Sequence, residues 1–94
     1  MLVDPLQKYL EEIESAFGKP ESGYIERYEE ECLTSERVNL RIRLRFPIGY
    51  MLEWNEAVIA EEGKIEHLGY RYHFQDSNNN LIFRYDKYTA FPPP

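Results

Sequence analysis

Strict alternation of apolar and polar side chains is the feature that most limits how this chain can fold. In the segment 37–46, RVNLRIRLRF, every second residue is apolar and most of the residues between them are arginines. Successive side chains of a β-strand point to opposite faces, so a period of two predicts a strand with one buried face. A second alternating stretch, 69–86, reads GYRYHFQDSNNNLIFRYD. Because the polar SNNN segment interrupts it, this stretch predicts a hairpin.

The N-terminal segment has a different period, which predicts an amphipathic helix. Its apolar residues recur at helical spacing and form one stripe: Leu6, Tyr9, Leu10, Ile13 and Phe17. Asp4 is expected to cap the N-terminus, with Pro5 in the first helical position. Gly18 is expected to end the helix.

Five strands are predicted after residue 23, at about 24–33, 37–46, 50–60, 64–75 and 81–86, and their short connections favour antiparallel neighbours. The predicted fold class is α+β: an N-terminal helix packed on one face of a five-stranded antiparallel meander sheet, in a single domain of residues 1–94. A bulge near 55–56 is needed to keep the apolar residues of the third strand in the core. The resulting register buries the aromatic side chains under the helix.

Composition narrows the classes of function. The net charge of −6 argues against broad non-specific nucleic-acid binding, although residues 37–94 carry a balance of +1 and leave room for a local basic site. We find neither an apolar run near the ~20 residues that cross a bilayer nor a secretion signal. The single cysteine and the lack of zinc-like spacing predict no metal and no cofactor, and a reducing cytoplasm as the setting. A chain this short could also gain stability from a partner or a second copy.

The polar face of the predicted sheet carries the arginines of the second strand, and the first strand beside it is rich in glutamate. The expected register sets Glu26 across from Arg45. Arg41 then lies across from Glu30, or from Glu31 if the strands slip by one residue. Opposite charges across a ladder stabilise it by a few tenths of a kcal/mol per pair. We therefore expect these arginines to form structural ion pairs rather than phosphate sites.

The hairpin at 69–86 holds the strongest candidate site. A four-residue loop sets Arg71 directly across from Arg84, and like charges in this position are destabilising unless another group compensates for them. Asp86 could do so in part, and so could an anion such as an RNA phosphate. His73 lies two residues from Arg71 on the same face, and histidine titrates in the range that suits acid–base catalysis. His67 is expected on this face too, exposed to solvent.

Arginine, histidine and carboxylate groups together can cleave RNA. A base activates the 2′-hydroxyl, a cation stabilises the charged phosphorane, and an acid protonates the leaving oxygen. Tyrosine and glutamine can stack on bases or hydrogen-bond to them. The candidate catalytic residues are His73 and Asp86, and the candidate phosphate- or RNA-binding residues are Arg71, Arg84, Tyr72 and Gln75. A histidine on a polar sheet face is more often an ordinary surface residue, so a non-catalytic interpretation stays open.

The hairpin resembles the most recognisable segment of the TumE-type toxins of bacterial and archaeal toxin–antitoxin pairs. The matching residues are Tyr70, Tyr72, His73, Gln75, Leu81, Ile82, Arg84 and Asp86, and an LRIR-like strand precedes them at 40–43. The resemblance implies a cytoplasmic toxin made beside a DNA-binding antitoxin that neutralises it. Its helix-plus-sheet layout is also similar to RelE-like toxins, many of which cut RNA.

One departure from that family keeps two functions open. Family members usually continue past the aspartate with a histidine-containing tail, whereas this chain reads KYTAFPPP after Asp86. The first hypothesis is a TumE-like toxin that acts on cellular RNA as a metal-independent ribonuclease. The second is a degenerate, non-catalytic interaction module that binds an antitoxin-like partner or pairs with a second copy as a homodimer.

Overall fold

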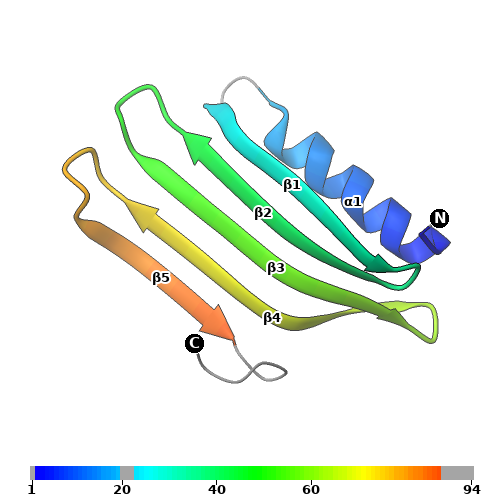
Figure 1. Ribbon diagram of the computed structural model, residues 1–94. Helices are drawn as coiled ribbons and strands as arrows, with labels where there is room; N and C mark the ends of the chain where they lie inside the picture. Colours follow the sequence, from blue (N-terminus) through cyan, green and yellow to red (C-terminus); the bar gives the residue numbers. More distant parts are fainter. Residues whose placement is uncertain (1, 20–22, 88–94) are drawn as a thin grey trace.

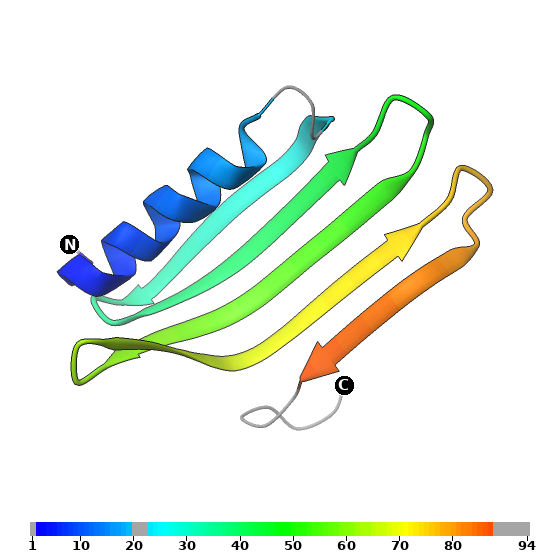
Figure 2. The same ribbon diagram turned by 180° about the vertical axis from the view of Figure 1, so that it is seen from behind.

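The computed structural model describes residues 2–19 and 23–87. Its elements are α1 (Asp4–Phe17), β1 (Tyr24–Thr34), β2 (Arg37–Arg45), β3 (Met51–Glu61), β4 (Lys64–Gln75) and β5 (Leu81–Lys87). The strands form one antiparallel sheet in the order β1-β2-β3-β4-β5 (Figures 1 and 2). The helix α1 covers one face of this sheet and contacts β3 and β4. The predicted helix and five-stranded meander are confirmed.

The helix starts differently from the prediction. Val3, not Asp4, occupies the N-cap position, and its extended backbone has φ −65° and ψ 153°. The Val3 amide donates to the Ser35 carbonyl at 2.9 Å, which ties the entry of the helix to the β1–β2 turn. Asp4 therefore lies inside the first turn and makes no side-chain capping bond. The cap at Gly18 is confirmed, since its amide donates to the Glu14 carbonyl at 2.9 Å.

The core lies between α1 and the sheet face that it covers. Its buried members are Leu6, Leu10, Val38, Leu40, Val58 and Ala60. The helical stripe supplies the first two and the alternation of β2 supplies the next two, as the sequence predicts. At the other end of the helix, the Phe17 ring meets the Trp54 ring edge-on with centroids 5.3 Å apart.

Two predicted turns are confirmed, and the first of them also sets the predicted strand register. Ile42 lies opposite Trp54 across the turn at 47–49. The β3–β4 turn consists of Glu62 and Gly63, which have φ values of 51° and 76°. Positive φ at both central residues is the geometry that matches the twist of a two-residue hairpin.

The bulge predicted near 55–56 is wrong. β2 and β3 pair without interruption, and the register shifts in β4 instead. Ala57 lies opposite Gly69, whereas the next residue of β3 lies opposite His67, so Leu68 is the extra residue. An extra residue reverses the faces of all side chains on one side of it. His67, predicted to be exposed on the polar face, therefore lies on the helix side with its side chain 31% exposed.

The uninterrupted pairing of β2 with β3 places Glu56 on the helix side of the sheet, where it is only 4% exposed. Its carboxylate accepts hydrogen bonds from the Tyr9 hydroxyl at 2.5 Å and from the Tyr72 hydroxyl. The Nε2 atom of His67 lies 3.1 Å from the Oε2 atom of Glu56. A buried carboxylate is costly unless it is hydrogen-bonded, and these partners come from α1 and β4. The Glu56 cluster (Glu56, Tyr9, Tyr72 and His67) thus ties the helix to the sheet.

β5 is less covered than predicted. Phe83 and Tyr85 lie on the helix-side face, and the Phe83 ring stacks 5.2 Å from the Phe74 ring. They are nevertheless 37% and 61% exposed, because the helix packs over β3 and β4 and leaves β5 open. The expectation that one face buries all the aromatic side chains under the helix is wrong for this strand.

Replacing Tyr9 with phenylalanine should lower the free energy of unfolding by about 1.5–3 kcal/mol, the usual range for a hydrogen bond to a charged group. The change keeps the ring that meets His67 and removes only the hydroxyl that donates to Glu56. Urea denaturation followed by circular dichroism measures it. Tyr85→Phe is the matched control, because this exposed ring should change stability by no more than about 0.5 kcal/mol. Equal values for the two variants would contradict a stabilising role for the Tyr9 contact.

The same comparison has an expected pH dependence. Burial, and then the hydrogen bond to Glu56, raise the pKa of the Tyr9 hydroxyl above its ordinary value of 10.0. A group whose pKa is raised by folding contributes stability below its unfolded pKa and loses it as the pH rises through the folded pKa. The difference in unfolding free energy between wild type and Tyr9→Phe should therefore shrink above about pH 10.

Candidate functional site

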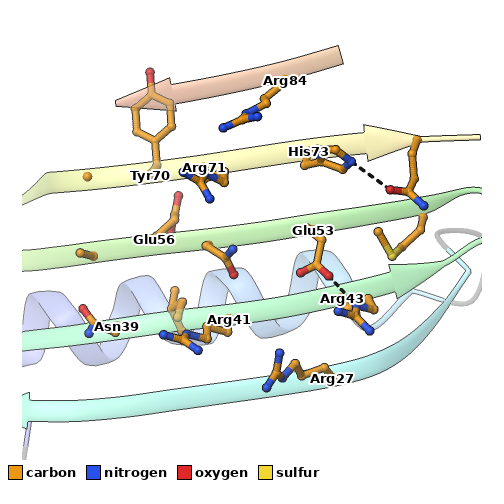
Figure 3. A pocket seen from close by; sticks show the side chains of 16 residues that line it. Arg27, Asn39, Arg41, Arg43, Glu53, Glu56, Tyr70, Arg71, His73 and Arg84 are labelled. Carbon is orange, nitrogen blue, oxygen red and sulfur yellow. Dashed lines mark hydrogen bonds and ion pairs between the residues drawn. The ribbon is translucent and has the colours of Figure 1, made fainter. Parts of the chain in front are cut away.

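The sheet face opposite α1, which we call the open face, is hollowed into a groove of about 750 Å³ (Figure 3). Arginines from four strands line it: Arg27 from β1, Arg41 and Arg43 from β2, Arg71 from β4 and Arg84 from β5. Ala57 and Gly69 also line the groove, and their small size leaves room between the longer side chains. The groove therefore combines positive charge with a hollow large enough for a ligand.

Strand register arranges the groove residues in rows that cross the sheet. One row consists of Arg43, Glu53, His73 and Arg84, and the next of Arg41, Asn55, Arg71 and Asp86. Direct neighbours in such rows have Cβ atoms about 4.5–5.5 Å apart. His73 thus lies between a carboxylate on β3 and a guanidinium on β5.

The predicted pairing of β4 with β5 is wrong by two residues. Arg71 lies opposite Asp86, and Arg84 lies opposite His73. The Asp86 carboxylate accepts from Arg71 Nε at 3.3 Å and from Arg84 Nε at 2.9 Å. One carboxylate is therefore shared by two guanidinium groups, and the like-charge pair expected from the sequence does not form across the ladder.

The error in register has two local causes. The loop is one residue longer than predicted, since Asp76 accepts from the amides of Asn78 at 2.8 Å and Asn80 at 2.9 Å and Gln75 lies opposite Leu81. These hydrogen bonds lower the pKa of the Asp76 carboxyl, with the Asn80 amide as the main cause. The pairing then shifts by one further residue within β5, between positions 81 and 83.

A chain of hydrogen bonds orients the ring of His73. The Gln75 side-chain amide donates to Asn79 Oδ1 at 2.8 Å, which turns its Oε1 atom toward His73 Nε2 at 3.0 Å (Figure 3). An amide oxygen only accepts, so His73 Nε2 carries the proton in this contact. The lone pair of the neutral ring is then on Nδ1, and that nitrogen is the one available to accept a proton.

Two of the β2 arginines form ion pairs, one of them with the predicted partner. Arg45 Nε lies 3.1 Å from Glu26, although the register sets Tyr24 rather than Glu26 opposite Arg45. Hydrogen bonding from Arg45 is the main cause that lowers the pKa of Glu26. Arg43 pairs with Glu53 of β3 at 2.5 Å rather than with a glutamate of β1. The ladder between β1 and β2 is therefore only partly an ion-pair ladder.

Arg41 differs from its neighbours on β2. It lies opposite Glu29, not opposite Glu30 or Glu31 as expected, and Glu29 pairs with Arg27 at 2.9 Å. Its side chain is exposed, and it forms no ion pair with any residue of 2–19 or 23–87. Arg41 is therefore the groove cation best placed to meet an incoming anion.

The structure brings five of the six predicted site residues to the open face: Arg71, His73, Gln75, Arg84 and Asp86. Tyr72 is not among them, because it donates to Glu56 on the helix side and stacks on Trp54 with centroids 3.9 Å apart. The sequence placed Glu53 on this polar face, but it did not indicate Arg27 as a groove residue, and it assigned Arg41 to an ion pair. The alternation along β2 showed which of its side chains share a face, but the cross-strand partner of each side chain depends on the register.

A family model described as Toxin TumE matches residues 13–94, which include all five strands of the sheet. The chain belongs to the TumE toxin family. The match includes the hairpin at 69–86 and confirms the resemblance seen there, and membership in a toxin family implies an antitoxin partner. No curated protein and no solved structure matches the chain. Within the described part of this TumE family member, no helix is long and apolar enough to cross a membrane, and no cluster of three or more His, Cys, Asp or Glu could hold a metal ion.

Neutral His73 is expected to be the Nε2–H tautomer, because Gln75 accepts from that nitrogen. Long-range ¹⁵N–¹H spectra of the imidazole groups measure the tautomer, and Gln75→Ala should increase the share of the Nδ1–H form. Asn78→Ala is the control, since this exposed loop residue makes no side-chain contact with Gln75. A neutral Nδ1–H ring in the wild type would show that the contact does not orient His73.

Proposed function

We propose that this TumE family member acts on cellular RNA, binding a single-stranded segment along the open face and cleaving it at His73. The observation that carries this proposal is a groove in which five arginines surround one histidine with an oriented ring. Phosphate contacts supply most of the affinity for nucleic acid, and arginine is well suited to them. The acidic net charge of −6 does not oppose this, because binding is confined to one groove.

The arginines have separate roles in the proposed complex. Arg41 meets a phosphate directly, since its side chain is exposed and has no ion-pair partner within the described chain. Arg71 and Arg84 share one carboxylate, Asp86, so the three groups together keep a net positive charge. Asp86 is a positioning residue in this arrangement, because it touches the two guanidinium groups rather than the reacting atoms.

The chemical step uses the 2′-hydroxyl of the RNA as the nucleophile. His73 Nδ1 accepts the 2′-hydroxyl proton, the 2′-oxygen bonds to the adjacent phosphorus, and the bond from phosphorus to the 5′-oxygen breaks. The leaving oxygen takes a proton from water, and His73 later returns its own proton to solvent. Arg84, the cross-strand neighbour of His73, stabilises the charge that develops on the phosphorane oxygens. The products are a 2′,3′-cyclic phosphate end and a 5′-hydroxyl end.

The proposal also includes a partner and a setting, and the toxin family and the sequence support both. The antitoxin of the proposal is a DNA-binding protein made together with the toxin, and the site of action is the cytoplasm. A small helix-turn-helix protein encoded beside this chain would support the first point.

A second candidate function is a non-catalytic module that binds its antitoxin or another copy of itself. Two observations favour it. Asp86 pairs with both Arg71 and Arg84 and so offsets part of their charge without any ligand. The outer strand β5 also exposes several apolar side chains, which is typical of protein-binding surfaces.

His73→Ala should abolish toxicity in an induced host and remove the RNA ends that carry a 2′,3′-cyclic phosphate. The physical reason is the loss of the only group in this proposal that accepts the 2′-hydroxyl proton, and such a loss typically costs about 10²–10⁴ in rate. Sequencing of the RNA ends, together with growth curves, measures both effects.

Lys64→Ala is the matched control for that experiment, because Lys64 is exposed in the β3–β4 hairpin and outside the groove. Circular dichroism checks that both variants fold. Equal toxicity and identical RNA ends for wild type and His73→Ala would remove His73 from the mechanism. Wild-type protein that binds its antitoxin tightly but cleaves no RNA would favour the non-catalytic function.

Arg41→Ala should weaken binding of single-stranded RNA and reduce the slope of log K against log salt by about 0.7, the value for one phosphate contact. Fluorescence anisotropy in the His73→Ala background measures this without cleavage of the RNA. Arg45→Ala is the control on the same strand and face, because Arg45 is paired with Glu26 and does not line the groove. An equal loss of affinity in both variants would show that the effect is general charge rather than a contact at Arg41.

A further inference from the structure

The two outer strands of the described sheet differ in chemistry. β1 carries four glutamates within six residues, at positions 26, 29, 30 and 31. Charged side chains on an edge strand prevent it from pairing with another sheet. β5 has no such run of like charges, since its charged residues Arg84, Asp86 and Lys87 are of both signs, and its exposed residues include Leu81 at 56%, Ile82 at 48%, Phe83 at 37% and Tyr85 at 61%. An outer strand with this much exposed apolar surface is a template for a further strand.

We propose that two copies of this chain pair antiparallel through β5, with a two-fold axis at Tyr85, and join their sheets into one. The occupant of the edge is thus a second copy. The inference goes beyond the proposed RNA cleavage and does not depend on it.

Charge complementarity selects both the occupant and the register. In an antiparallel pair the facing residues lie on the same side of the sheet, so a two-fold axis must pass through one residue of β5 and its copy. An axis at Arg84 would set Arg84 against Arg84 of the partner subunit, which is repulsive. An axis at Tyr85 sets Arg84 opposite Asp86 of the partner subunit, and by symmetry this pair forms twice.

The helix-side face is compatible with the same register. Tyr85 would lie opposite Tyr85 of the partner subunit, and its 61% exposed ring would be covered. Phe83 would lie opposite Lys87 of the partner subunit, whose aliphatic stem can pack on the ring. The segment from Phe83 to Lys87 is therefore self-complementary on both faces, which a strand selected to bind an unrelated chain has no reason to be.

Pairing in this way would also change the candidate site. The Arg71, Arg84 and Asp86 cluster lies on the open face beside the edge, so the clusters of two copies would meet at the seam. Arg84 of the partner subunit would then complete the site next to Asp86, which in one copy is shared between two guanidinium groups. The two grooves would become one continuous positive surface with the two-fold axis at its centre.

Cysteine cross-linking tests the register in full-length protein made by cell-free synthesis without an antitoxin. The background is Cys32→Ser, because Cys32 is an exposed free thiol on β1. Tyr85→Cys should form a disulfide-linked dimer at least about tenfold faster than Arg84→Cys or Asp86→Cys, since only residues on the axis bring their Cα atoms within disulfide range. Equal rates for the three variants, or faster cross-linking at position 84, would overturn the proposed axis.

Light scattering provides the second measurement and needs no cysteine. Wild-type protein should have twice the mass of one chain. Arg84→Glu should be monomeric, because it sets two acids against each other, and Arg84→Glu with Asp86→Arg should restore the dimer. A monomeric wild type at about 100 μM, or dimers in all three proteins, would overturn pairing through the Arg84–Asp86 contacts.

Discussion

The extra residue Leu68 in β4 is the constraint on which both faces of this sheet depend. His67, the residue before it, lies on the helix side of the sheet. Gly69, the residue after it, is the first of the alternate β4 residues that line the open face. A shift of one residue reverses the face of every side chain beyond it. It therefore places one histidine, His67, beside the helix and the other, His73, in the groove.

Under the helix, the consequence is that residues from both sides of Leu68, His67 before it and Tyr72 after it, meet the buried carboxylate of Glu56. Glu56 would be costly at 4% exposure if it stood alone, but Tyr9 of α1 and Tyr72 of β4 both donate to it. Apolar packing holds the helix through Leu6 and Leu10, and Tyr9, between them in the sequence, adds the polar contact to Glu56. Polar contacts in a dry environment are directional, so they fix the position of the helix as well as stabilise it.

On the open face, the consequence is a groove whose charges are paired unequally. Arg43 and Arg45 are held by carboxylates, Arg71 and Arg84 share one, and Arg41 has none within the described chain. An arginine that is held in an ion pair contributes to the stability of the sheet, whereas an arginine without such a pair is available to a ligand. The difference in ion pairing therefore separates the structural arginines from the binding ones. The proposed dimer would extend the same groove across the edge of β5, which is the side where the sheet is least covered.

The sequence was enough to predict the helix, five strands, their meander order and which residues of β2 share a face. Each of these depends on local period or on short connections, and both are visible along the chain. The family could also be recognised from the hairpin at 69–86. Three features depend instead on contacts between strands and helix: the bulge at Leu68, the two-residue shift that sets Arg71 opposite Asp86, and the burial of Glu56. Register is chosen by cross-strand fit and by loop hydrogen bonds such as those of Asp76, and the energies of alternative registers differ through contacts that a periodic pattern does not contain.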